Sequence, residues 1–200
     1  MSSSPSRKLT LSDIADIRAY ERERDGFRQQ VIELKRRRRV SVGPHITFVF
    51  ENRETVRFQI QEMARVERLY SDEQIATELR IYNPLIPEPG HLAATMFIEL
   101  TSEALLREWL PKLVNVERCV QLRIGDTRLV FVLDADHETQ LTRDDTTSAV
   151  HYVHLAVGAA DIVRCSREPV ALAIEHPNYS HTTTLGPDTI AELLGDLRGD

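Results

Sequence analysis

Cysteine and long apolar runs are scarce in this sequence, and each shortage excludes a class of protein. Two cysteines, Cys119 and Cys165, are too few for the disulfide framework of a small secreted domain. No apolar run approaches the roughly 18 residues that cross a membrane, and residues 1–10 lack the apolar segment of a secretory signal. The sequence therefore predicts a cytoplasmic protein with reduced thiols and no membrane partner.

Common catalytic motifs are also absent. The eight glycines form neither a phosphate-binding loop nor a dinucleotide fingerprint, and Cys-x-x-Cys, Gly-x-Ser-x-Gly and His-Glu-x-x-His do not occur. These absences weaken the prediction of an enzyme without excluding one. In size and composition the chain is typical of a globular protein, with 200 residues of which 42% are hydrophobic and 28% charged.

Charge is unevenly distributed along the chain. Residues 1–50 contain 11 Lys and Arg against 6 Asp and Glu, whereas residues 51–200 contain 14 against 25. The acidic body argues against nucleic acid as a partner, since it would repel phosphates. The sharpest basic run has two interpretations, a contact for an acidic partner or a cationic helix end paired with carboxylates of the body. Its members are Lys35, Arg36, Arg37, Arg38 and Arg39.

The pattern of apolar residues predicts an α+β fold with a mostly antiparallel sheet built from hairpins and flanked by helices. Residues 1–9 are predicted to be disordered and residues 10–200 to form a single domain, with a split near residues 83–90 as the alternative. The expected elements are a charged helical arm over about 11–38, hairpins over 45–60 and 116–133, strands over 92–100, 147–157 and 170–176, and helices over 61–69, 71–81, 103–110 and from 187 onward. Local signals support three of them: Gly125-Asp126 is a common tight-turn pair, Ser71-Asp-Glu-Gln matches a capping box, and Pro187 suits a first helical turn.

A histidine cluster is the candidate metal site. If the strands over 147–157 and 170–176 formed a hairpin, His151 and His176 would be neighbours at its open end. His181, in the loop that follows, and Glu175 could join them. Such a set would suit Zn or Fe(II), or general acid–base chemistry. The alternative is that these histidines cap neighbouring carbonyls or face water.

A second candidate is a polar surface for a partner. Arg53, Arg57, Gln59 and Glu62 cluster around the hairpin predicted over 45–60. The alternative interpretation is a solvated sheet face against which the N-terminal arm packs.

Nine short phrases are distributed along nearly the whole chain. They are Leu9-Thr-Leu-Ser-Asp-Ile, Tyr20-Glu-Arg-Glu-Arg, Val42-Gly-Pro, Phe50-Glu-Asn-Arg, Arg57-Phe-Gln-Ile-Gln-Glu-Met, Tyr82-Asn-Pro-Leu-Ile-Pro, Glu99-Leu-Thr-Ser, Ser148-Ala-Val-His-Tyr and His176-Pro-x-Tyr. Together they resemble one uncharacterised bacterial family, catalogued as domain of unknown function 3501, over about residues 9–198.

The resemblance implies a role in redox or peroxide defence, since members of the family are often encoded beside rubrerythrin-like and iron–sulfur redox proteins. It carries no functional residue over to this chain. The first hypothesis is therefore a non-catalytic accessory protein that binds such a redox partner through the basic arm and the polar surface. The alternative is a metal-binding protein or metal-dependent enzyme that uses the histidine cluster. Binding of RNA or a nucleotide through the basic run is a third, weaker hypothesis.

Overall fold

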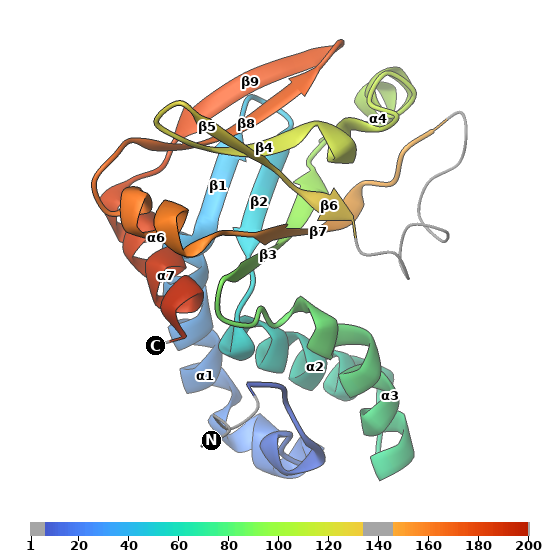
Figure 1. Cartoon of the computed structure of the whole chain (residues 1–200). Coiled ribbons are helices and arrows are strands. Elements are labelled where there is room, and N and C mark those ends of the chain that lie inside the picture. The colour runs from blue at the N-terminus through green and yellow to red at the C-terminus, as the bar shows by residue number, and fades with distance from the viewer. Residues whose placement is uncertain (1–6, 134–145, 200) are drawn as a thin grey trace.

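The computed structural model describes residues 7–133 and 146–199, and it confirms the predicted α+β class. Two antiparallel sheets lie on either side of one hydrophobic core, and a group of helices projects from them (Figure 1). Within the described residues, no helix is both long and apolar enough to cross a membrane.

The two sheets have separate strand orders. The first runs β1-β2-β3-β7-β6 and the second β5-β4-β8-β9. The first sheet comprises β1 (Arg39–Val42), β2 (Ile46–Phe50), β3 (His91–Ile98), β6 (Val132–Leu133) and β7 (Val150–Ala156). The second comprises β4 (Val120–Ile124), β5 (Thr127–Val130), β8 (Val170–His176) and β9 (Tyr179–Thr184). Fully buried side chains such as Phe48, Leu122 and Leu172 fill the core.

Shorter helices flank the sheets. In Figure 1, α6 and α7 lie at one side of the two sheets and α4 at the other. Their bounds are α4 (Glu103–Trp109), α6 (Ala159–Cys165) and α7 (Pro187–Arg198), with a 3₁₀ turn, η3 (Val116–Cys119), before β4. Pro187 occupies the first turn of α7, as the sequence predicts.

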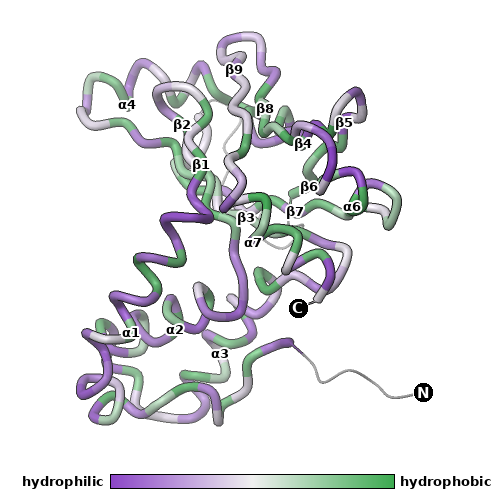
Figure 2. The backbone as a smooth tube through the Cα atoms, turned by 90° about the vertical axis from the view of Figure 1, so that its left-hand side faces the viewer, coloured by the Kyte–Doolittle hydropathy of each residue, from purple (hydrophilic) through white to green (hydrophobic). Residues whose placement is uncertain are grey.

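The remaining helices form a lobe with its own small core. Figure 2 shows α1 running from this lobe up to the first sheet. The core of the lobe contains Val56, Ile60, Leu79 and also Leu9, which the sequence predicts to be disordered. Residues 1–6 of that predicted segment lie outside the described residues. The elements of the lobe are η1 (Leu11–Asp13), α1 (Ile17–Arg38), α2 (Arg53–Glu67), α3 (Asp72–Tyr82) and η2 (Asn83–Leu85).

The hairpin predicted over residues 45–60 is wrong, because its second arm is the start of α2. The alternation of Val56, Phe58 and Ile60 is typical of a strand, but Val56 and Ile60 are also one helical turn apart and both are buried. Asn52 decides between the two, since its side-chain oxygen accepts hydrogen bonds from the backbone N–H groups of Glu54 and Thr55 and so caps a helix.

The hairpin predicted between the strands over 147–157 and 170–176 is also wrong. β7 pairs with β3 and β6 in the first sheet, whereas β8 pairs with β4 and β9 in the second. By contrast, the hairpin around Gly125 and the capping box at Ser71 are confirmed. Both confirmed features depend on residues that are neighbours in sequence, whereas the choice of strand partner depends on the whole fold.

Candidate ligand-binding pocket

The four residues of the predicted metal site lie on three strands and in different surroundings. His151 is buried on β7, where its Nε2 atom lies 2.9 Å from both the Thr147 hydroxyl and the Ser148 carbonyl. His176 is buried on β8, with its Nε2 atom 3.1 Å from the Val114 carbonyl. Burial lowers the pKa of His151, which favours its neutral form.

Glu175 and His181 point elsewhere. Glu175 alternates with His176 along β8, is exposed, and forms ion pairs with Arg123 and Arg128. His181 is exposed on β9, and its ring packs against that of Tyr179. Within residues 7–133 and 146–199, no group of three or more His, Cys, Asp or Glu side chains is placed to bind a metal ion. Among the described residues, the four side chains of the predicted cluster therefore do not come together as one metal-binding group.

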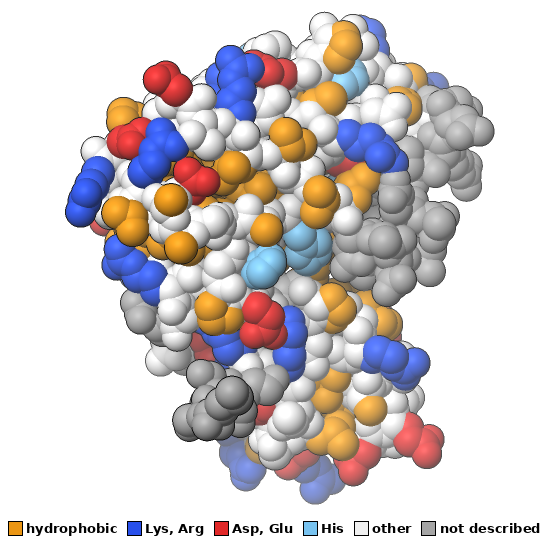
Figure 3. Space-filling model, in the orientation of Figure 1, with side chains coloured by type: hydrophobic (Ala, Val, Ile, Leu, Met, Phe, Trp, Pro, Cys, Tyr) orange, Lys and Arg blue, Asp and Glu red, His pale blue; other side chains and the backbone are white. Residues whose placement is uncertain are grey.

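Most of the basic run at the end of α1 is paired within the chain. Arg36, Arg37, Arg38 and Arg39 form ion pairs with Glu33, Glu192, Asp196 and Glu99, respectively. On the face drawn in Figure 3, Lys and Arg side chains are scattered among Asp and Glu. Among the described residues, no carboxylate forms an ion pair with Lys35, which instead lines a pocket described below.

The predicted polar surface lies on helix α2, against which the N-terminal arm packs. Arg53 and Arg57 both contact Asp13. Glu62 accepts hydrogen bonds from Tyr20 on α1 and from two arginines, Arg24 and Arg65. These donors hold the pKa of Glu62 at about 2, below the value of 4.5 for a free glutamate.

We expect Glu62→Gln to lower the free energy of unfolding by about 2 kcal/mol at pH 7. Because the pKa of Glu62 is depressed in the folded state, the stability that its carboxylate contributes is complete above pH 4.5 and is lost as pH falls towards 2. Urea unfolding of both proteins should therefore give curves that converge in acid. Glu33→Gln, at an exposed pair, is the matched control and should change little. A difference that does not vary with pH would contradict this assignment.

A cavity of about 230 Å³ lies where the helical lobe meets β3 and β7. The exposures of its lining residues give it an inner and an outer end. Glu51, Thr55 and Thr95 are buried, whereas Lys35 is half-buried and Gln59 is exposed. The other lining residues are mainly aromatic and aliphatic: Val56, Tyr82, Leu85, Phe97, Val150 and Tyr152. A cavity with apolar walls and a few converging polar groups is the usual form of a small-molecule site.

Glu51 is the charged group at the inner end. It follows β2 directly and is only 8% exposed. Its two carboxylate oxygens accept hydrogen bonds from the hydroxyls of Thr95 (2.7 Å) and Thr55. Among the residues that the structure describes, no Lys, Arg or His forms an ion pair with this carboxylate. Burial of a charged carboxylate is unfavourable unless a positive charge compensates it, and the two hydroxyl donors of Glu51 are uncharged.

The two tyrosines of the wall are neutral at physiological pH. Burial, with smaller contributions from Tyr82 and Glu51, raises the pKa of Tyr152 to about 12. Burial likewise raises the pKa of Tyr82. The pocket therefore presents aromatic faces and uncharged hydroxyls around one buried carboxylate, a combination that suits a cationic ligand.

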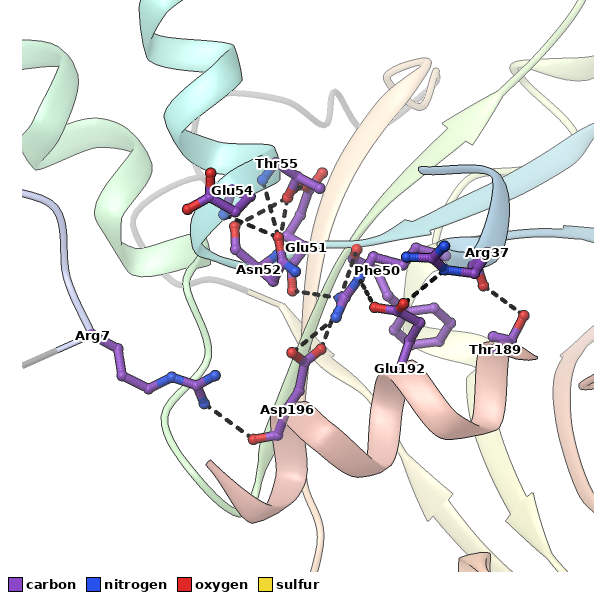
Figure 4. A network of polar contacts seen from close by, with 11 residues as sticks. Arg7, Arg37, Phe50, Glu51, Asn52, Glu54, Thr55, Thr189, Glu192 and Asp196 are labelled. Atoms are coloured by element: carbon purple, nitrogen blue, oxygen red, sulfur yellow. Dashed lines mark hydrogen bonds and ion pairs between the residues drawn. The ribbon is translucent and has the colours of Figure 1, made fainter. Parts of the chain in front are cut away.

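A buried arginine fixes the backbone that carries Glu51. Arg38 forms a two-pronged ion pair with Asp196 of α7, with N–O distances of 2.8 and 2.9 Å, and its Nε atom contacts Glu192 (Figure 4). Its Nη1 atom also lies 3.4 Å from the Phe50 carbonyl and 3.5 Å from the Glu51 carbonyl. The Arg38 guanidinium therefore contacts the main-chain carbonyl of Glu51 rather than its carboxylate. Its ion pairs are with Glu192 and Asp196 of α7.

Four of the phrases that carry the family resemblance supply lining residues of this pocket. Phe50-Glu-Asn-Arg contains Glu51, and Arg57-Phe-Gln-Ile-Gln-Glu-Met contains Gln59. Tyr82-Asn-Pro-Leu-Ile-Pro contributes Tyr82 and Leu85. Ser148-Ala-Val-His-Tyr contributes Val150 and Tyr152. The sequence alone does not bring these phrases together, because Glu51 and Tyr152 are about 100 positions apart along the chain.

Comparison with known proteins finds similarity over nearly the whole chain, as the quoted phrases do. A family model described as a protein of unknown function, DUF3501, matches residues 8–197. A crystal structure of a novel protein of unknown function from Burkholderia pseudomallei K96243 is similar over 95% of this chain and 99% of that one, with 35% identity and a TM-score of 0.87. No curated protein matches the chain.

Proposed function

This chain belongs to the DUF3501 family, and we propose that it binds a small molecule through a protonated amine, which Glu51 holds at the inner end of the pocket. The observation that carries this proposal is a buried carboxylate that has hydroxyl partners but no ion pair among the described residues. Each hydroxyl satisfies one lone pair, so both oxygens can still accept a hydrogen bond from an ammonium group.

The walls support the same ligand. Tyr82, Phe97 and Tyr152 offer aromatic surface to the body of the molecule and to its positive charge. The volume of about 230 Å³ is below the usual range for sites of drug-sized ligands, so the ligand is a small metabolite.

Two roles expected from the sequence stay predictions. An accessory role beside a rubrerythrin-like or iron–sulfur redox protein depends on the family resemblance, and a metal-dependent role depends on the histidines. Neither supplies a reason for a buried carboxylate that forms no ion pair with any described residue, which is why we place ligand binding first.

Calorimetric titration with benzylamine tests the proposal. We expect millimolar or tighter binding to the wild-type protein and at least a tenfold weaker affinity for Glu51→Gln, which keeps the shape of the side chain and removes its charge. Glu54→Gln is the matched control, because Glu54 lies three residues away on α2 and does not line the pocket.

Benzyl alcohol, a neutral analogue, should bind much more weakly than benzylamine, and thermal unfolding will show whether Glu51→Gln is folded. Equal affinity of benzylamine for the wild type and Glu51→Gln would overturn the proposal. So would equal affinity of the wild type for benzylamine and benzyl alcohol, or the absence of benzylamine binding at millimolar concentration.

A further inference from the structure

We infer that the ligand also carries an acidic group at its other end, so that the pocket takes a small ω-amino acid rather than a simple amine. This inference rests on the proposed function. It comes from Lys35, the one residue of the basic run that lines the pocket.

Lys35 differs from the four arginines that follow it. Each of those arginines forms an ion pair with a carboxylate, whereas no such pair joins Lys35 to any described residue. Its Nζ atom lies over the Phe58 ring of α2, 5.9 Å from the ring centre, so the ammonium group lies beside that helix. A half-buried ammonium held in this way is available to an anionic group of a ligand.

Lys35 and Glu51 line the same pocket and do not form an ion pair with each other. Opposite charges in one cavity attract strongly, so their separation means that the fold holds them at different places. Glu51 is 8% exposed and Lys35 is half-buried, which places Lys35 nearer the solvent. A molecule with complementary charges at its two ends would satisfy both.

The shape of the pocket selects among amino acids. In an α-amino acid, the amine and the carboxylate are attached to the same carbon, so one molecule could not place them at opposite ends of the cavity. In an ω-amino acid, an apolar body separates the two groups. The walls formed by Tyr82, Phe97 and Tyr152 suit such a body, whether an aromatic ring or a methylene chain.

Three matched compounds test the inference by calorimetry: 4-(aminomethyl)benzoate, benzylamine, which lacks the carboxylate, and 4-methylbenzoate, which lacks the amine. We expect 4-(aminomethyl)benzoate to bind the wild type about tenfold more tightly than benzylamine, and 4-methylbenzoate to bind weakest. Lys35→Met should remove the advantage of 4-(aminomethyl)benzoate over benzylamine.

Arg36→Met is the control, since it removes the same charge from the neighbouring, 77% exposed side chain and should preserve the order of affinities. Lys35→Arg should keep most of the advantage, because it keeps the charge. Thermal unfolding will verify that each variant is folded.

The possible failures are distinguishable. If both amines bind the wild type equally, or if Arg36→Met acts as Lys35→Met does, the ligand needs no acidic group and this inference is overturned while the proposed function stands. If Glu51→Gln binds both amines as well as the wild type does, or if neither amine binds the wild type, the proposed function fails and this inference fails with it.

Discussion

Replacing Arg38 with methionine should lower the free energy of unfolding by about 4 kcal/mol, one of the two largest effects of any substitution discussed for this chain. Arg38 is 2% exposed and joins the end of α1 to α7 through Asp196 and Glu192. Removing the guanidinium would leave the buried Asp196 carboxylate without its partner, and an unpaired buried charge is costly.

The double variant Arg38→Met/Asp196→Leu should recover part of the loss, because it removes both charges and leaves none buried alone. Urea unfolding measures the free energies of unfolding of the wild type, Arg38→Met and the double variant. Arg36→Met is the control on the same helix turn, and its exposed ion pair should contribute well under 1 kcal/mol. If Arg38→Met were no less stable than Arg36→Met, Arg38 would not hold the two parts of the fold together.

Replacing Gly43 with alanine should lower the free energy of unfolding by about 3 kcal/mol. Gly43 lies in the turn between β1 and β2 with φ of +72°, a conformation that side chains with a Cβ atom rarely adopt. A Cβ atom there would lie 2.5 Å from the Tyr179 hydroxyl oxygen. Tyr179 cannot readily move, since it is buried, donates to the Val42 carbonyl at 2.7 Å and accepts from the His45 N–H group at 3.0 Å.

Gly26 provides the opposite control. It lies inside α1, and a Cβ atom there would have no heavy atom within 4 Å. Gly26→Ala should therefore raise the free energy of unfolding by about 0.5–1 kcal/mol through better helix propensity. A Gly43→Ala protein as stable as the wild type would show that the turn and Tyr179 can shift at little cost.

The sequence predicts the features that are set by neighbouring residues. The capping box at Ser71, the tight turn at Gly125 and the start of α7 at Pro187 each depend on a few adjacent side chains, and the structure has all three. The same kind of signal, the Asn52 cap, precedes α2, but the alternation that follows it predicts a hairpin instead. Alternation over six residues was too short to distinguish a strand from a helix with buried positions four apart.

The pocket could not be predicted, because its parts come together only in the folded chain. Glu51 and Tyr152 are about a hundred positions apart, and β3, which separates β2 from β7 in the first sheet, determines how their strands are placed. Strand pairing, which the sequence does not reveal, also determines whether the histidines of the predicted cluster are neighbours. The predicted grouping depended on a β7–β8 hairpin, and the assignment of these strands to different sheets separates His151 from His176.

The central claim is that Glu51 is the acceptor for a ligand's amine, and a crystal structure of the protein with bound benzylamine tests it most directly. We predict that the ammonium nitrogen lies about 3 Å from a carboxylate oxygen of Glu51, with the ring between Tyr82 and Tyr152. Benzylamine bound elsewhere on the protein, with this pocket occupied only by water, would contradict the account.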